Sequence, residues 1–304
     1  MDPYHHGELA VQKRAGLAAS ARAVSAAIMT EVPDVAAEFL AAQPMLVVGA
    51  ADHEGAVWSS LLTGEPGFIT VDGPSSLDIA AAPSPGDPLH ATLTGRTRLG
   101  MIAVEPGTRR RMRMNGTARP HGHGLAVELE QIYANCPKYI QKRVPERRPV
   151  TPGVPRRGHA LTAQDIVLVE GTDTFFVATA DQDGNADASH RGGNPGFLRV
   201  LGPDRLRWPD YVGNSMFNTF GNLEVNPRAG LLVPDWTTGT LLHVTGTAVV
   251  DWDPAHATVL PGAQRVVDFT VREVVRVDHA SPLRWSAPQY SRFNPPTAPE
   301  GTGT

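Results

Sequence analysis

The sequence is poor in cysteine and has no long hydrophobic run. Cys136 is the single cysteine among 304 residues, so no disulfide can form within the chain, and a reducing cytoplasm is the expected compartment. The absence of any run of about 18 apolar residues excludes a membrane-spanning helix. Residues 1–7 (MDPYHHG) lack the basic and then apolar order of a signal peptide. We therefore expect a cytoplasmic protein without a membrane partner, in which Cys136 is buried and unreactive.

A strong excess of one charge is also absent. The net charge is −4 and 41% of the residues are apolar, which favours a globular protein and argues against a general nucleic-acid binder. The positive charges are nevertheless concentrated, because residues 96–157 contain 14 of the 27 Lys and Arg residues and only four acids. This basic region is either a solvated face or the lining of an anion site.

Sequence motifs of several common chemistries are missing. His5-His6 and His121-x-His123 have no acidic or cysteine partner at ligand spacing, so we expect no metal site. No Gly-x-Ser-x-Gly, P-loop or dinucleotide fingerprint occurs either.

Part of the chain is written twice. Residues 45–77 align without a gap to residues 174–206 with 13 identities in 33 positions, where chance gives roughly two. Both copies contain Gly-x-Pro-Gly-Phe-x-x-Val-x-Gly-Pro, and after one extra residue 100–118 aligns with 230–248. The sequence therefore predicts a duplicated domain.

Each copy has the pattern of a small β-domain. Apolar, β-branched runs are interrupted by Asp-x-x-Gly or Asp-Gly turns, which are typical of hairpins. We predict a mainly β (α+β) protein of two tandem split β-barrels packed as an internal pseudo-dimer. Helices are expected over residues 8–29, 34–42, 124–136 and 162–170. The expected parts are an N-terminal helical segment (1–33), a first barrel with a degenerate site, a helix and a linker (34–150), a second barrel (151–294) and a flexible tail (295–304).

The two copies differ most in the segment that joins their aligned blocks. The second copy reads RWPDYVGNSMFNTFGNLEVNPRAG over 207–230, whereas the first reads DIAAAPSPGDPLHATLTGRTRLG over 78–100. Small hydrogen-bonding residues on a turn before a short helix can bind a phosphate. In the second copy these are Gly213, Asn214, Ser215, Asn218, Thr219, Gly221 and Asn222. The alternative is an ordinary polar loop.

Charged side chains also distinguish the copies. His190 and Arg191 of the second copy take the places of two leucines of the first. Conversely, strand alternation puts Arg109, Arg111 and Arg113 of the first copy on one face, where the second copy has Gly239, Leu241 and His243. These arginines either protect a sheet edge or reach across the interface to an anion held by the second copy.

These stretches resemble the pyridoxamine 5′-phosphate oxidase-like family of FMN-binding split barrels, in a version with two barrels in one chain. The resemblance rests on DGNADASHRGGNPGF, on LRWPDYVGNSMFNTFGNLEVNPRAGLL, on RRRMRMNG followed by NCPKYIQ, and on the N-terminal YHHGELAVQKRAG. It extends over most of residues 4–250 and implies that FMN is bound in the cleft between the barrels.

The resemblance also implies roles for individual residues. It places phosphate contacts at Ser189, His190, Arg191, Asp210, Asn218, Thr219 and Asn222. Arg111 matches the residue that reaches from the partner barrel to the isoalloxazine ring. Archetypal oxidases carry Arg-Lys where this chain has Asn218-Thr219, so Arg191 and the arginines of the first copy would have to neutralise the phosphate. Asn214 and Ser215 complete the expected cofactor site.

The expected function is that of an FMN-dependent oxidoreductase acting on an unidentified small molecule with an electron donor. His190 is the candidate catalytic residue, although a hydrogen-bonding spacer is an equal interpretation. Lys138 and Tyr139 are candidate substrate contacts. The alternative function is a non-catalytic flavin or haem-binding carrier or sensor, with His190 as the haem ligand, and a deazaflavin could replace FMN. A homodimer beyond the internal pair is compatible with the sequence.

Overall fold

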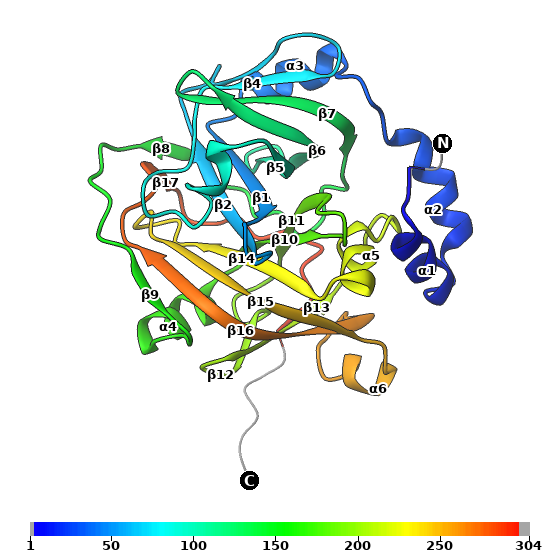
Figure 1. Ribbon diagram of the computed structural model, residues 1–304. Helices are drawn as coiled ribbons and strands as arrows, with labels where there is room; N and C mark the ends of the chain where they lie inside the picture. Colours follow the sequence, from blue (N-terminus) through cyan, green and yellow to red (C-terminus); the bar gives the residue numbers. More distant parts are fainter. Residues whose placement is uncertain (1–2, 298–304) are drawn as a thin grey trace.

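The computed structural model of the chain describes residues 3–297. Within these residues, antiparallel strands form two large sheets and one small two-stranded pair, with short helices around them (Figure 1). No helix in this part of the chain is long and apolar enough to cross a membrane.

The first sheet contains the strands of the first copy. They are β1 (Met45–Ala51), β2 (Val57–Thr63), β3 (Ile69–Val71), β4 (Ser76–Ile79), β5 (Thr97–Glu105), β6 (Arg110–His121) and β7 (Gly124–Ala134). Their spatial order is β2-β1-β5-β6-β7-β4-β3, and all neighbours are antiparallel.

The second sheet contains the strands of the second copy. They are β10 (Thr174–Ala180), β11 (Ala186–Gly192), β12 (Arg199–Gly202), β13 (Arg205–Asp210), β14 (Arg228–Pro234), β15 (Leu241–Asp251) and β16 (Arg265–Val277). Their order is β11-β10-β14-β15-β16-β13-β12, and β9 (Arg156–Gly158) adds to β16. The small pair is β8 (Pro145–Arg147) with β17 (Leu283–Trp285).

The two sheets have the same strand order. Exchanging β1–β7 for β10, β11, β12, β13, β14, β15 and β16 converts the first order into the second. The prediction of a mainly β protein of two tandem split barrels with flanking helices is therefore confirmed.

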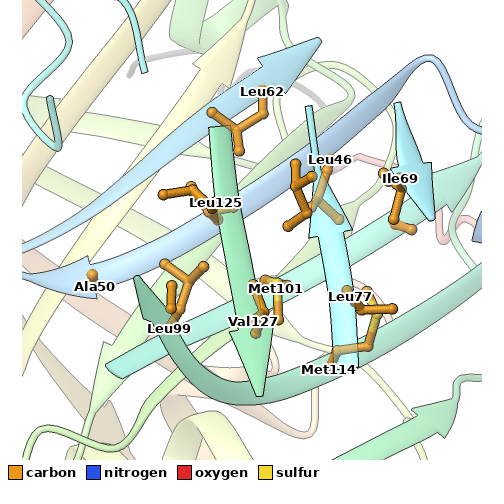
Figure 2. Packing of buried hydrophobic residues seen from close by; sticks show 14 of the residues in the cluster. Leu46, Ala50, Leu62, Ile69, Leu77, Leu99, Met101, Met114, Leu125 and Val127 are labelled. Atoms are coloured by element: carbon orange, nitrogen blue, oxygen red, sulfur yellow. The ribbon is translucent and has the colours of Figure 1, made fainter. Parts of the chain in front are cut away.

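Each barrel has its own hydrophobic core. In the first barrel, Leu46, Leu99 and Met101 pack with Leu125 and Val127, as Figure 2 shows. In the second barrel, Trp208 lies between Phe175 and Phe269, with ring centroids 5.4 and 6.1 Å apart. These buried apolar side chains are the main source of stability for each sheet.

The barrels pack against each other through related positions. Gly100 of β5 faces the backbone of Asp187 in β11, and Gly230 of β14 faces the backbone of Trp58 in β2. A Cβ atom on either glycine would lie closer than 3.0 Å to that backbone. In the repeat, Gly100 corresponds to Gly230 and Asp187 corresponds to Trp58. The two contacts are therefore related by the pseudo-symmetry of the repeat, as expected for an internal pseudo-dimer.

Short helices surround the sheets. They are α1 (His6–Arg14), α2 (Ala18–Val24), α3 (Asp34–Ala41), α4 (Ala163–Gly171), α5 (Asn218–Val225), α6 (Pro254–Ala257) and the 3₁₀ turns η1 (Ser25–Ala27) and η2 (Thr92–Thr94). The helix expected over 8–29 is interrupted after α1, where Gly16 has a φ of +70°. Helix α1 lies beside α5 of the second barrel (Figure 1).

The helix predicted over 124–136 is wrong, because this segment is strand β7. Leu125, Val127 and Leu129 point inward with the period of two of a strand. A bulge opposite Asn115 and Gly116 then shifts the phase, so that Ile132 also points inward. The bulge adds one residue to the strand, so the apolar residues before and after it fall at the spacing of a helix in the sequence. This spacing caused the wrong prediction.

The boundaries 1–33, 34–150, 151–294 and 295–304 stay a prediction. The segment after β7 is packed rather than loose, since Arg143 forms a buried ion pair with Asp173 at 2.7 Å. In the expected flexible tail, the Pro295 carbonyl accepts a hydrogen bond from Asn194 Nδ2 at 3.1 Å. Residues 298–304 of that tail lie outside the described residues.

Candidate functional site

A cavity of about 260 Å³ lies between the two barrels. Its walls come from β5, β6 and residues 135–139 on one side, and from β11, the end of β13, the loop 211–217 and the start of α5 on the other. Ten of the twelve predicted site residues line it: Arg111, Tyr139, Ser189, His190, Arg191, Asp210, Asn214, Ser215, Asn218 and Thr219.

The structure does not bring Asn222 and Lys138 to this cavity. Asn222 Nδ2 donates to Thr179 Oγ1 at 3.1 Å, and its Oδ1 lies 3.0 Å from His5 Nε2. Lys138 Nζ lies 5.6 Å from the centre of the Phe293 ring. These contacts give both residues a supporting position outside the cavity.

Of the three arginines predicted to share a face, Arg111 and Arg113 line the cavity and Arg109 does not. Arg109 precedes β6 in a turn with a φ of +58°, so strand alternation does not apply to it. Its Nε donates to the Ile140 carbonyl at 2.9 Å.

Four arginines line the cavity, and two of them have a carboxylate partner. Arg113 pairs with Asp187 across the barrel interface, and Arg265 pairs with Asp210 at 2.9 Å. Among residues 3–297, Arg111 and Arg191 form no ion pair with a carboxylate. The cavity therefore contains two uncompensated positive charges, which favour an anionic ligand.

The pKa values of these two arginines report the same imbalance. Burial, together with the nearby charges of Arg191 and Arg113, lowers the pKa of Arg111 to about 10. Burial also lowers the pKa of Arg191 to about 10, although Asp210 acts in the opposite direction. Both side chains still carry their charge at neutral pH, and an anion beside them would relieve the repulsion.

The His190 side chain contacts one of the two arginines, Arg111. Its Nδ1 is 3.0 Å from Arg111 Nη1, and since a guanidinium can only donate, Nδ1 is the acceptor. Burial, followed by the charges of Arg111 and Arg191, moves the pKa of His190 well below its ordinary value. His190 is therefore a neutral imidazole that accepts a hydrogen bond from Arg111.

Helix α5 begins at the cavity without a cap. The preceding residue, Phe217, has a φ of +63°, and its side chain makes no capping hydrogen bond. The first N–H groups of a helix have no partner within the helix, so they are available to an anion. Asn218 and Thr219 are both buried at this end.

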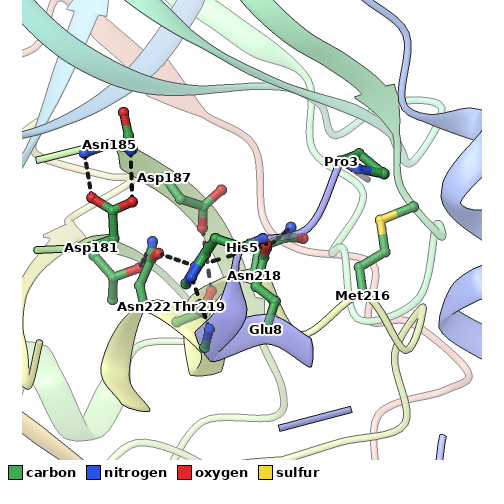
Figure 3. A network of polar contacts seen from close by, with 12 residues as sticks. Pro3, His5, Glu8, Asp181, Asn185, Asp187, Met216, Asn218, Thr219 and Asn222 are labelled. Atoms are coloured by element: carbon green, nitrogen blue, oxygen red, sulfur yellow. Dashed lines mark hydrogen bonds and ion pairs between the residues drawn. The ribbon is translucent and has the colours of Figure 1, made fainter. Parts of the chain in front are cut away.

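The N-terminal segment holds α5 in position, as Figure 3 shows. Glu8 accepts a hydrogen bond from Asn218 Nδ2, and Gln12 Nε2 donates to the Met216 carbonyl at 3.0 Å. His5 contacts Asn222 and caps α1 together with Glu8. Sequence reasoning missed this network, because the usual cap rules name Ser, Thr, Asp and Asn rather than His.

An aromatic wall completes the cavity. The rings of Tyr139 and Tyr211 lie 5.1 Å apart, and Tyr139 Oη donates to the Val212 carbonyl at 3.2 Å. Tyr139 has a φ of +67°, an uncommon conformation for a bulky residue. Cys136 also lines the cavity and is half-buried, so the expectation of a buried cysteine is wrong. The wall formed by the rings of Tyr139 and Tyr211 suits a planar ligand.

The positions related to this site by the repeat carry apolar side chains. Leu61 and Leu62 of the first barrel take the places of His190 and Arg191, and Leu241 of the second barrel takes the place of Arg111. All three pack in hydrophobic clusters. The side chains of the two halves are thus as asymmetric as the sequence predicts.

Comparison with known proteins relates the second barrel to a family. Residues 163–278 match the family model described as pyridoxamine 5′-phosphate oxidase. No curated protein sequence matches the chain. Three of the solved structures that it resembles each correspond to less than half of the chain.

These three structures are as follows. A candidate pyridoxamine 5′-phosphate oxidase from Lactobacillus delbrueckii is 26% identical over 38% of this chain and 94% of its own, with a TM-score of 0.33. A point variant of HupZ from Group A Streptococcus is 15% identical over 38% and 98%, with a TM-score of 0.33. A pyridoxamine 5′-phosphate oxidase-related, FMN-binding protein from Nostoc punctiforme is 10% identical over 39% and 86%, with a TM-score of 0.27.

The family match spans β10 to β16, the sheet that supplies Ser189, His190, Arg191 and Asp210 to the cavity. The second barrel thus matches the pyridoxamine 5′-phosphate oxidase family over most of its length.

Proposed function

We propose that the chain binds one FMN in the cavity between the barrels and acts as an oxidoreductase on a small molecule. The observation that carries this proposal is the pair of arginines, Arg111 and Arg191, that line the cavity without a carboxylate partner. A phosphate of charge near −2 would neutralise them. The family match supports a flavin as the molecule that bears this phosphate.

The residues present fit such a cofactor. Arg191, Ser189 and the uncapped start of α5 would hold the phosphate. Arg111, whose buried Nε has no partner among the described residues, would contact the ring. Bound FMN would supply two-electron redox chemistry at its ring.

The residues of the chain bind and orient rather than react. His190 is neutral and accepts a hydrogen bond from Arg111, so it positions the guanidinium. A positive charge near the ring favours the reduced, anionic state of a flavin. Tyr139 and Tyr211 form the wall against which a planar substrate would stack.

The direct test is the absorption spectrum and the mass of the small molecule that copurifies with the protein. A yellow protein whose flavin bleaches anaerobically with NAD(P)H or another donor and recovers in air supports the proposal. A flavin that binds and never cycles with any donor indicates a carrier instead. A Soret band indicates haem, and a deazaflavin is distinguished by its mass.

Replacing Arg191 with alanine should weaken FMN binding at least tenfold. The residue would supply a charge-assisted hydrogen bond to the phosphate, which contributes roughly 1.5–3 kcal/mol. Fluorescence titration of the apoprotein measures the affinity. Arg205→Ala, which removes an exposed arginine from the same barrel, is the matched control and should bind FMN normally. Unchanged binding by Arg191→Ala would remove Arg191 from the site.

Replacing Arg111 with leucine copies the residue of the other half, Leu241. We expect a more negative flavin reduction potential, because a positive charge beside the ring is lost. This effect would come from the first barrel, whereas the second barrel holds the phosphate. Spectroelectrochemical titration measures the potential. Arg119→Leu removes an exposed arginine from the same strand and should leave the potential unchanged. Equal potentials for the wild type and Arg111→Leu would contradict a contact with the ring.

A further inference from the structure

The repeat also relates buried polar residues of the two barrels. Ser60 of β2 corresponds to Ser189 of β11, and His243 of β15 corresponds to Arg113 of β6. The segment between β4 and β5 corresponds to the segment between β13 and β14, which contains α5. The first barrel therefore has its own version of the place where the second barrel presents the uncapped start of α5.

A carboxylate fills this place in the first barrel. Asp87 is 8% exposed, and its Oδ1 accepts hydrogen bonds from Ser60 Oγ at 2.6 Å and from the Leu89 N–H at 2.8 Å. Its Oδ2 lies 3.9 Å from Nε2 of His243. The carboxylate thus contacts a serine hydroxyl, a backbone N–H two residues onward and a basic side chain.

At the corresponding site of the second barrel, the described part of the chain places no carboxylate in the position of Asp87. Arg113, the counterpart of His243, pairs with Asp187 instead. Asp87 corresponds to Met216 or Phe217, according to where the extra residue of the second copy is placed. Phe217 precedes α5 without capping it, and Ser189, Arg113 and the start of α5 all line the cavity. Ser189 and the start of α5 therefore line a space that is open to a ligand from solution.

We propose that Asp87 is an internal counterpart of the bound anion: its carboxylate occupies in the first barrel the position that an anionic ligand takes in the second. Asp87, together with Leu61 and Leu241, then limits the chain to one ligand site. The assignment rests on the proposed function in one respect, namely that the cavity of the second barrel takes an anion.

The first experiment removes the internal anion. Asp87→Ala leaves Ser60, the Leu89 N–H and His243 around a space that fits formate, the group removed. At constant ionic strength, formate should raise the melting temperature of Asp87→Ala, since a ligand that binds only the folded state stabilises it. The wild type and Asp87→Asn, whose amide still fills the space, should not respond. If Asp87→Ala does not fold alone, formate should restore its refolding. An Asp87→Ala protein that is indifferent to formate in both measurements overturns the proposal.

The second experiment places a carboxylate in the second barrel. Phe217→Asp places a carboxylate just before α5, in the same way that Asp87 lies just before Leu89 in the first barrel. Asp also tolerates the positive φ of residue 217 better than Phe does. FMN binding should weaken at least tenfold, whereas Phe217→Asn, which also loses the ring and can cap the helix, should retain clearly more affinity. Equal affinity of the Asp and Asn variants overturns the proposal. A wild-type protein that binds no FMN refutes the proposed function instead, and the response of Asp87→Ala to formate remains a separate result.

Discussion

Replacing Asp187 with alanine should lower the free energy of unfolding by about 3–5 kcal/mol. Asp187 is the ion-pair partner of Arg113, and the two side chains are 3% and 6% exposed. The pair joins β11 of the second barrel to β6 of the first. Without Asp187, the Arg113 charge stays buried at the barrel interface without compensation, and Thr219 Oγ1 loses an acceptor at 3.5 Å.

Urea unfolding of apoprotein measures this loss. The double variant Asp187→Ala with Arg113→Leu should lose clearly less stability than Asp187→Ala alone, because both charges are absent. A single variant as stable as the wild type would mean that the pair is solvated in the folded protein.

Glu8 should make stability depend on pH. Burial is the main cause that raises the pKa of Glu8 from 4.5 to about 7, although hydrogen bonds from His5 and Asn218 and the charge of Arg113 oppose it. The folded state therefore binds more protons than the unfolded state between these values, and stability falls as the pH rises through this interval. The other charged groups that face this network are Asp187, Asp181 and His6.

Glu8→Gln removes this titration and preserves the capping box, in which Gln is an accepted residue. Between pH 5 and 8, the wild type should lose about 2–3 kcal/mol of stability relative to Glu8→Gln. Chemical denaturation across this range measures the difference. Glu38→Gln, an exposed change on α3 with the same loss of charge, should follow the wild type. Parallel stability curves for the wild type and Glu8→Gln would show that Glu8 is ionised in the folded protein throughout this range.

The repeat explains why much of the fold could be predicted from sequence. The gapless match of residues 45–77 to residues 174–206 indicated two domains of the same fold. The turn residues within the matched segments indicated the hairpins β1–β2 and β10–β11. Strand β7 was missed because its bulge imitates helical spacing. The order of the strands in each sheet depends on long-range pairing, which leaves no local pattern.

The candidate site could be predicted where the copies differ. His190, Arg191 and Arg111 stood out because the other copy has leucine at each position, and all three line the cavity. Asp187 and Glu8 were missed, because their partners lie 74 and 210 residues away and neither residue belongs to a recognised motif. Asn222 was expected at the cavity from its position in the turn, but it faces Thr179 and His5.

The central claim is that the two barrels have specialised, so that the second holds the anionic end of one cofactor and the first contributes Arg111 to the same site. Equilibrium titration of the apoprotein with FMN, with the bound flavin counted per chain, tests this claim most directly. The account predicts saturation at one FMN per chain. Two equivalent FMN molecules per chain, or no uptake at micromolar concentrations, would contradict it.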